Sequence, residues 1–198
     1  MHNPKSSVIT VKLVIAISGQ VGAGKTTQAK KLAETFNLKY VSNGMLFREL
    51  ARERGVSLQE LHKIAERDPE IDRIVDSRAR EVAMKGNVVV EGHLACWLLR
   101  DIADICIFFK APLEERARRV MIRDNVSYDE ALRDLQLRER SNWSRAMKYY
   151  GVNIHNWTVA DLIIDTSKLS IEGINTVLVT FVQLYIREKL KEIRKCRK

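Results

Sequence analysis

The 198-residue sequence contains only three cysteines, and they are widely spaced. Cys96, Cys106 and Cys196 form no CxxC pair, and an odd number of cysteines leaves no complete disulfide framework. The sequence therefore predicts neither a disulfide-stabilised fold nor a zinc site, and it favours a reducing compartment.

Long apolar runs are also missing. No run approaches the roughly 18 residues that a membrane-crossing helix requires. Residues 1–12 form an extension in which Lys12 interrupts the apolar stretch, and this stretch leads directly into a glycine-rich segment. Such an arrangement is typical of a buried first strand rather than of a signal peptide. We therefore expect a cytoplasmic protein with no membrane partner.

Basic residues exceed acidic ones, and the formal net charge is +9. Such an excess occurs in nucleic-acid-binding proteins and also in enzymes that act on polyphosphates. The basic residues are spread along the chain, apart from a dense group in the predicted helix end at residues 186–198. No aromatic residues interleave with that group, so a solvated helix end is favoured over a nucleic-acid-binding tail.

Short apolar segments alternate with amphipathic ones along the whole chain. Five of them are predicted strands, at residues 13–18, 39–42, 88–91, 104–109 and 161–165. Residues 13–18 have the continuous apolar character of a strand covered on both faces. Helical periodicity and capping residues occupy the intervals. This alternation predicts an α/β fold, in which helices cover both faces of a five-stranded parallel sheet. We expect one domain over residues 1–198, because no repeat or linker divides it.

A glycine-rich motif, GQVGAGKT at residues 19–26, lies between the first predicted strand and the first predicted helix. Its glycines let successive N–H groups point at phosphate oxygens, and the helix N-terminus adds a favourable dipole. Lys25 suits the β- and γ-phosphates, and the Thr26 hydroxyl suits magnesium. The predicted ATP-binding residues are Gly19, Gln20, Val21, Gly22, Ala23, Gly24, Lys25, Thr26 and Thr27.

This phosphate-binding loop does not identify the reaction, because GTPases, ATPases, helicase cores and small-molecule kinases share it. The chain has no NKxD sequence for guanine, which argues against a GTPase, and it is short for a motor core.

The segment after the second predicted strand reads VSNGMLFR at residues 41–48. A Ser-x-Gly turn followed by a helical arginine resembles the nucleoside monophosphate kinases. This resemblance implies that Ser42, Gly44 and Arg48 bind the acceptor nucleotide. A guanidinium pairs with phosphate in a fixed fork, so Arg48 is expected to hold the acceptor's α-phosphate.

An acidic residue, Glu91, ends the third predicted strand. Ligands of such sheets bind beyond the carboxyl ends of the strands. A carboxylate beside a phosphate-binding loop commonly orders the water shell of magnesium. We therefore expect Mg²⁺ as cofactor, held by Thr26 and, through water, by Glu91.

Several further segments extend the resemblance over more than four-fifths of the chain. Taken in order, the chain resembles the cytidylate kinases of the short archaeal type. The segments are ISGQVGAGKTT at 17–27, VSNGMLFRELARERG at 41–55, DPEIDR at 68–73, GNVVVEGHLACW at 86–97, KAPLEERARR at 110–119 and YGVNIHNWTVADLIIDTS at 150–167.

The chain departs from that family at two acceptor positions. His93 stands where the family usually has arginine, and Met45 stands where it usually has aspartate. A histidine can donate to a phosphate or ribose oxygen, but it is charged only when its pKa lies above ambient pH. His93 is retained as an acceptor-binding candidate, with a packing role as the alternative.

Arginines near residues 138–145, RERSNWSR, correspond by resemblance to a small lid at about 136–150. Arg138 and Arg145 lie seven residues apart, which places them on one face of the predicted helix. The resemblance implies that both stabilise the transferred phosphoryl group, and catalysis of this kind depends on positioning and cationic charge. Arg78 and Asp161 match positions that the family uses toward the acceptor, and the acceptor-binding segment spans about 42–85.

The resulting hypothesis is transfer of the γ-phosphoryl group of ATP to CMP or dCMP. A second hypothesis keeps the kinase but changes the acceptor to another nucleoside monophosphate or a small metabolite. A third, from a different class, is a nucleotide-gated RNA-binding protein that uses the basic tail. The first hypothesis includes no nucleic-acid partner, and we expect a monomer.

Overall fold

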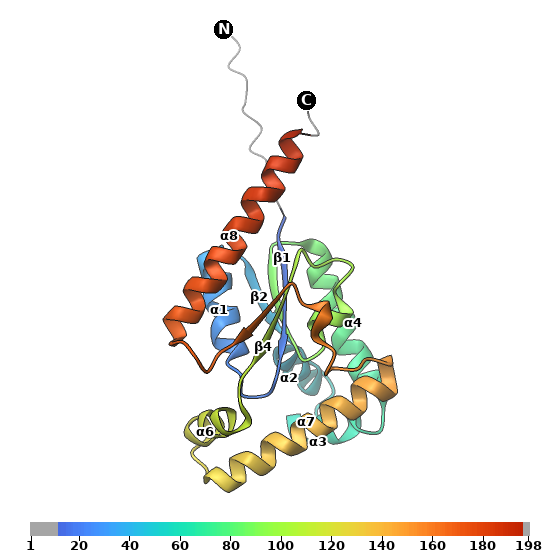
Figure 1. Cartoon of the computed structure of the whole chain (residues 1–198). Coiled ribbons are helices and arrows are strands. Elements are labelled where there is room, and N and C mark those ends of the chain that lie inside the picture. The colour runs from blue at the N-terminus through green and yellow to red at the C-terminus, as the bar shows by residue number, and fades with distance from the viewer. Residues whose placement is uncertain (1–11, 196–198) are drawn as a thin grey trace.

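The computed structural model describes residues 12–195, and one sheet of parallel strands forms its centre. The strand order is β2-β3-β1-β4-β5 (Figure 1). The strands are β1 (Val14–Gly19), β2 (Lys39–Ser42), β3 (Val88–Glu91), β4 (Ile105–Lys110) and β5 (Leu162–Asp165). The predicted α/β class and parallel sheet are confirmed, and each strand begins and ends within one residue of its predicted bounds.

Helices cover both faces of this sheet, because alternate residues of its strands are apolar on both sides. On one face, Ile15 and Ile17 pack with residues of α1 (Lys25–Thr35) and α8 (Ile171–Lys195). On the other, Ala16 packs with residues of four helices. These are α2 (Asn43–Glu53), α3 (Leu58–Ala65), α4 (Pro69–Lys85) and the short α5 (Ala95–Leu98).

Two more helices, α6 (Leu113–Asp124) and α7 (Tyr128–Tyr150), lie beyond the carboxyl ends of the strands (Figure 1). They pack against each other through an apolar cluster that includes Val120 and Leu135. A 3₁₀ turn, η1 (Trp157–Val159), precedes β5. The predicted acceptor-binding segment therefore corresponds to α2–α4, and the predicted lid lies within α7.

Side-chain caps begin several of these helices, as the sequence predicts. Ser57 accepts a hydrogen bond from the N–H of Glu60, and Asp68 accepts one from Glu70. Ser127 and Glu130 form a reciprocal capping box at the start of α7. Each cap satisfies backbone donors that the first helical turn leaves unpaired.

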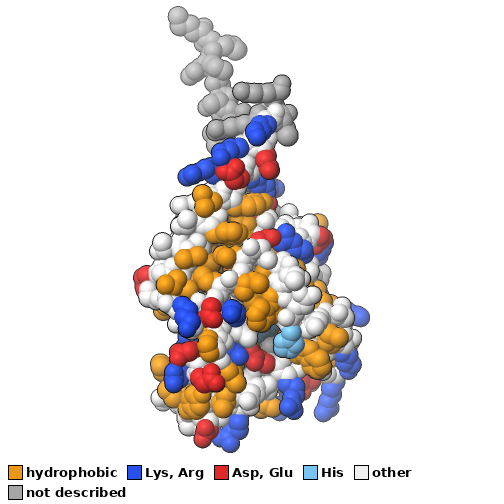
Figure 2. Space-filling model, viewed as in Figure 1, with side chains coloured by type: hydrophobic (Ala, Val, Ile, Leu, Met, Phe, Trp, Pro, Cys, Tyr) orange, Lys and Arg blue, Asp and Glu red, His pale blue; other side chains and the backbone are white. Residues whose placement is uncertain are grey.

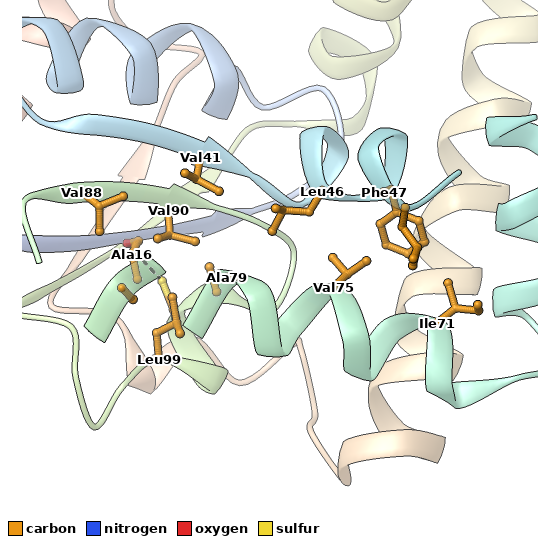
Figure 3. Packing of buried hydrophobic residues seen from close by; sticks show 14 of the residues in the cluster. Ala16, Val41, Leu46, Phe47, Ile71, Val75, Ala79, Val88, Val90 and Leu99 are labelled. Atoms are coloured by element: carbon orange, nitrogen blue, oxygen red, sulfur yellow. Dashed lines mark hydrogen bonds between the residues drawn. The ribbon is translucent and has the colours of Figure 1, made fainter. Parts of the chain in front are cut away.

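The core beneath α2 and α4 fixes where the predicted acceptor-binding segment lies. Figure 3 shows Leu46 and Phe47 of α2 directed toward Val75 of α4, with Val41 and Val90 of the sheet beside them. All five side chains are buried or nearly so. Their burial attaches the first turn of α2 to the carboxyl ends of β2 and β3, the edge of the sheet where ligands of this architecture bind.

Residues 1–11 and 196–198 lie outside the described range. The basic C-terminal helix end, residues 186–198, is therefore described only as far as residue 195. Within that range, Lys189 pairs with Asp104 and Lys191 pairs with Glu188. Figure 2 shows acidic side chains interspersed with basic ones at this end of α8. None of the helices described has the length and apolar character that crossing a membrane requires.

Candidate active site

The phosphate-binding loop follows β1 directly and adopts a conformation that requires glycine. Gly22 and Gly24 have φ values of 77° and 86°, in the left-handed region. At Gly19, with φ of 148°, a Cβ atom would overlap the carbonyl oxygen of Phe109. The loop therefore lies directly against the neighbouring strand β4, and this contact fixes its position.

The side chain of Gln20 anchors the loop from its outer side. Its Oε1 atom accepts a hydrogen bond from the N–H of Ala111 at 3.0 Å, and the backbone N–H of Gln20 donates to the carbonyl oxygen of Phe109 at 2.9 Å. The side chain thus connects the loop to the segment after β4. Gln20 is a predicted ATP-binding residue, and its side chain has a structural contact within the protein.

The N-terminus of α1 is free to bind an anion. Its N-cap residue, Gly24, provides no side-chain cap, and the first turn contains no acidic residue. The unpaired N–H groups and the helix dipole therefore favour a phosphate at this point.

Lys25 is buried and its ammonium group is directed back along the loop. Its Nζ atom donates to the carbonyl oxygens of Gly19 at 2.9 Å and of Gln20 at 2.8 Å. Burial lowers the pKa of Lys25 to about 8, and the carboxylate of Glu91 partly counteracts this decrease. A bound polyphosphate would supply the negative charge that keeps this group protonated.

Glu91 is held at the end of β3 by two hydroxyl groups. Thr26 donates to both of its oxygens at 3.1 Å, and the Tyr40 hydroxyl donates to Oε2 at 2.7 Å. Burial, followed by the bond to Glu91, raises the pKa of Tyr40 to about 12, so this hydroxyl stays a donor. The two residues predicted to bind magnesium, Thr26 and Glu91, are therefore adjacent.

One cavity, which we call the acceptor cavity, lies between the loop and the start of α2. Its volume is about 340 Å³. It contains four of the predicted acceptor-binding residues, Ser42, Gly44, Arg48 and His93. The full lining is Lys25, Thr26, Lys30, Tyr40, Ser42, Asn43, Gly44, Met45, Arg48, Glu91, Gly92 and His93.

A second cavity, the donor cavity, lies on the other side of the loop and has a volume of about 680 Å³. Apolar residues near the start of α8, including Ile171 and Ile174, line one part of it, and arginines line another. Lys25, Thr26, Glu91 and His93 line both cavities. Two ligands bound in them would therefore meet at this group of four side chains, which we call the junction.

His93 lies at the junction as a neutral side chain. Burial is the main reason that its pKa falls to about 3, and the cations Lys25, Arg145 and Arg138 lower it further. In the free protein His93 is therefore uncharged at neutral pH, unlike an arginine at the same position. It can still donate a hydrogen bond to a phosphate or ribose oxygen.

The two arginines of the predicted lid differ in their surroundings. Arg138 is exposed, pairs with Asp134 on its own helix and lines the donor cavity. Arg145 is largely buried and binds both oxygens of Asp72 on α4, at 2.9 and 3.1 Å. Its Nε atom has no partner among the described residues. Arg145 therefore connects α7 to the acceptor-binding segment.

Two of the predicted acceptor-binding residues lie outside both cavities. Arg78 forms a bidentate ion pair with Glu53, at 2.9 and 2.6 Å. Asp161 precedes β5, where it accepts hydrogen bonds from Arg100 and from the N–H of Cys106 at 2.7 Å. This position is at the amino edge of the sheet, opposite the loop.

Sequence reasoning missed several side chains that surround the site. Besides Tyr40, these are three arginines of α6. Arg116 is buried under the loop, where it donates to the Val21 carbonyl oxygen at 3.1 Å. Arg119 and Arg123 line the donor cavity. Their spacing of four residues, in a helix that follows a strand end, could have indicated one cationic face.

A family model described as "Cytidylate kinase-like family" matches residues 14–168. This range contains the loop, both cavity linings except the residues from Leu169 onward, and α7. The chain belongs to the cytidylate kinase-like family.

Archaeal cytidylate kinases match nearly the whole chain. The protein named cytidylate kinase from Staphylothermus marinus is 47% identical over 176 residues, which are 89% of this chain and 99% of the relative. The corresponding protein of Pyrobaculum islandicum is 50% identical over 170 residues, which are 86% of this chain and 92% of the relative. The resemblance read from the sequence is thereby confirmed.

Solved structures support the fold of this cytidylate kinase-like chain. An uncharacterized protein from Eubacterium ventriosum superposes with a TM-score of 0.69 at 22% identity, covering 87% of this chain and 99% of that one. A shikimate kinase from Bacteroides thetaiotaomicron gives 0.62 at 19% identity, with the same coverage. At these identities the likeness concerns the fold alone.

Proposed function

We propose that the chain transfers the γ-phosphoryl group of ATP to CMP or dCMP, giving ADP and CDP or dCDP. The observation that carries this proposal is the junction, where two cavities meet beside a phosphate-binding loop. A phosphoryl transfer needs this arrangement, because donor and acceptor must approach in line at one point. The family membership and the names of the archaeal relatives support cytidylate as the acceptor.

On the donor side, the loop and the N-terminus of α1 bind the phosphates of ATP. Lys25 moves its ammonium group from the carbonyl oxygens of Gly19 and Gln20 to the β- and γ-phosphates. Arg119 and Arg123 add positive charge to the same cavity, and the apolar residues near α8 suit the adenine base.

The oxygen ligands at the junction suit magnesium. Among residues 12–195 no cluster of three or more His, Cys, Asp or Glu side chains forms a metal site. Mg²⁺ typically binds one or two protein oxygens and completes its shell with water and substrate phosphates. The Thr26 hydroxyl and, through water, the Glu91 carboxylate would hold it. When bound, the ion neutralises charge that develops on the phosphate oxygens.

On the acceptor side, Arg48 and Ser42 place the acceptor phosphate, and the segment 42–85 encloses the nucleotide. The lid at about 136–150 brings Arg138 and Arg145 to the transferred group. No general base is needed, because the acceptor is already an anionic phosphate oxygen. Lid closure excludes water, which would otherwise hydrolyse ATP.

The test is an assay of CDP formation from CMP and ATP with magnesium. We expect Lys25→Ala to lower kcat/KM by at least about a thousandfold, which is the scale for loss of a preorganised charge at the transition state. The matched control Lys31→Ala changes a lysine on the same helix that lines neither cavity, and it should retain activity. The proposal fails if wild type forms no CDP, or if Lys25→Ala equals wild type.

The assay also separates the two alternatives. A screen of CMP, dCMP, UMP, AMP and GMP would reveal another acceptor through a higher kcat/KM. RNA binding would appear as salt-dependent affinity that deletion of residues 189–198 abolishes. The described part of that tail favours the kinase, because Lys189 and Lys191 are already ion-paired. A cytoplasmic location and a monomeric state stay predictions.

A further inference from the structure

The side chain of Asn43 lines the acceptor cavity in the first turn of α2. Its Nδ2 atom donates to Oδ1 of Asp76 on α4 at 3.0 Å. An ionised carboxylate can only accept, so this bond fixes which end of the amide faces Asp76. The Oδ1 atom of Asn43 accepts no hydrogen bond among the described residues, and it is not enclosed. Asn43 therefore offers a free acceptor.

Asp76 is itself held in place by the lid helix. The Tyr150 hydroxyl at the end of α7 donates to its second oxygen, Oδ2, at 2.5 Å. Burial raises the pKa of Asp76 to about 6, and the bonds from Tyr150 and Asn43 oppose that increase. Asp76 is therefore ionised at neutral pH. Each carboxylate oxygen of Asp76 thus accepts one hydrogen bond, from Asn43 or from Tyr150. The favourable orientation of the Asn43 amide is therefore the one in which its nitrogen faces Asp76.

Gly92 makes room for the Asn43 amide at the end of β3. A Cβ atom at residue 92 would lie 2.8 Å from Cγ and Oδ1 of Asn43. The amide thus packs directly against the backbone that follows Glu91. This contact places Asn43 against the wall of the acceptor cavity that β3 provides.

The other polar side chains of the acceptor cavity already have partners or charge. The Ser42 hydroxyl accepts from the N–H of Met45, and the Tyr40 hydroxyl donates to Glu91. Lys25, Thr26, Glu91 and His93 belong to the junction, where the reacting phosphates meet. Lys30 and Arg48 are cations and suit phosphate. Outside the junction, Asn43 is the neutral lining side chain whose acceptor atom receives no hydrogen bond among the described residues, so it can read a base edge.

We propose that Asn43 selects cytosine over uracil by accepting a hydrogen bond from the exocyclic amino group of the base. Asp76 and Tyr150 are positioning residues that hold the amide nitrogen and so keep the amide oxygen turned away from Asp76. Uracil presents a carbonyl oxygen at the same ring position, so two acceptors would then face each other without a proton between them. This inference rests on the proposed function, because it concerns the acceptor of the same reaction.

The experiment compares kcat/KM for CMP and for UMP, at saturating ATP and magnesium, in wild type and three variants. Asn43→Ala removes the acceptor, and we expect the CMP-to-UMP ratio to fall by about ten- to a hundredfold. Most of the loss should lie in KM for CMP. Asp76→Asn lets the Asn43 amide turn, and Tyr150→Phe removes one donor to Asp76. We therefore expect the CMP-to-UMP ratio to fall less in Asp76→Asn than in Asn43→Ala, and least in Tyr150→Phe.

Glu49→Ala is the matched control, because it truncates an exposed residue of the same helix that lines neither cavity. It should change both substrates alike and leave the ratio within about twofold. Thermal denaturation of each variant reports folding. A purely structural role of Asp76 or Tyr150 would reduce stability and both rates together, without changing the ratio.

The outcomes separate this inference from the proposed function. If wild type phosphorylates neither CMP nor UMP, the proposed function fails. If wild type phosphorylates CMP and Asn43→Ala keeps the wild-type ratio, the function stands and the inference is wrong. The inference is also wrong if wild type uses both substrates equally. A larger loss of selectivity in Asp76→Asn than in Asn43→Ala would assign base reading to Asp76 and overturn the role of Asn43.

Discussion

The donor and acceptor sides of this site are built in different ways. On the donor side, the part that binds phosphate is a continuous stretch of chain, residues 19–27, held by backbone hydrogen bonds and by close contact with β4. The acceptor side is assembled from β2, β3, α2, α4 and α7, and hydrogen bonds between side chains connect these elements. A local motif therefore determines the donor side, whereas the acceptor side depends on pairs distant in sequence. The following variants test this difference.

The largest expected effect is loss of stability at Arg116, which supports the donor side from beneath. Its side chain is only 5% exposed and donates to the carbonyl oxygens of Ala111 and Val21 and to the carboxylate of Glu139. Arg116→Ala leaves these acceptors unpaired and should lower the free energy of unfolding by about 3–5 kcal/mol. Urea denaturation measures the change.

Arg118 supplies the control for that prediction. It lies two residues further along α6, is exposed and pairs with Glu115 on the same helix. Arg118→Ala should change the free energy of unfolding by no more than about 0.5 kcal/mol. Equal effects of the two variants would show that the loop does not depend on the buried guanidinium.

Arg145 should matter next, because it connects the lid helix to the acceptor side. Arg145→Ala is expected to lower kcat by about a hundredfold, which is the scale for one lost charge-assisted contact to a transition state. The control Arg133→Ala changes an exposed arginine on the same helix and should keep kcat within about twofold. Steady-state kinetics measure both. An unchanged kcat would show that Arg145 acts only through its ion pair with Asp72 and not on the transferred group.

The pH dependence of ATP binding tests the donor side alone. Burial lowers the pKa of Lys25 to about 8, so the free protein loses this charge as pH rises through 8. Bound phosphate favours the protonated form. The Kd for ATP should therefore increase by up to about tenfold between pH 7 and pH 9. Calorimetry measures this, and Lys25→Met should remove the dependence. A flat wild-type profile over that range would contradict it.

The smallest effect is expected where Arg78 pairs with Glu53. If Arg78 leaves this pair to bind the acceptor, Arg78→Ala should raise KM for CMP about three- to tenfold, whereas Glu53→Gln should leave it equal or lower. Each variant should cost at most about 1 kcal/mol of stability, because the pair is partly exposed. Equal KM values in both variants would make the pair purely structural.

The fold was predictable because its signals are local. Apolar runs and capping residues such as Ser127 indicate each element without reference to the others. The loop, Lys25, Thr26 and Glu91 were predictable for the same reason, since a strand end and a helix start position them.

The acceptor side was less predictable, because its residues act through partners far away in the sequence. Nothing local indicates that Tyr150 lies on Asp76, or that Arg78 meets Glu53. The neutral state of His93 likewise follows from burial beside three cations, which no pattern of neighbouring residues encodes. Long-range packing decides such contacts, and a single sequence does not reveal it.

The sheet order carries a consequence for folding. β1, which leads into the loop, pairs with β3 on one side and β4 on the other, and Val14 aligns with Val88. The β1–β3 pairing brings together two strands that are separated in the chain by α1, β2 and α2–α4. We therefore expect β1, the strand that leads into the loop, to pair late in folding. Proteins dominated by such non-local parallel pairing fold slowly. The phosphate-binding loop is thus encoded in nine adjacent residues, yet we expect it to become ordered only after most of the domain has assembled.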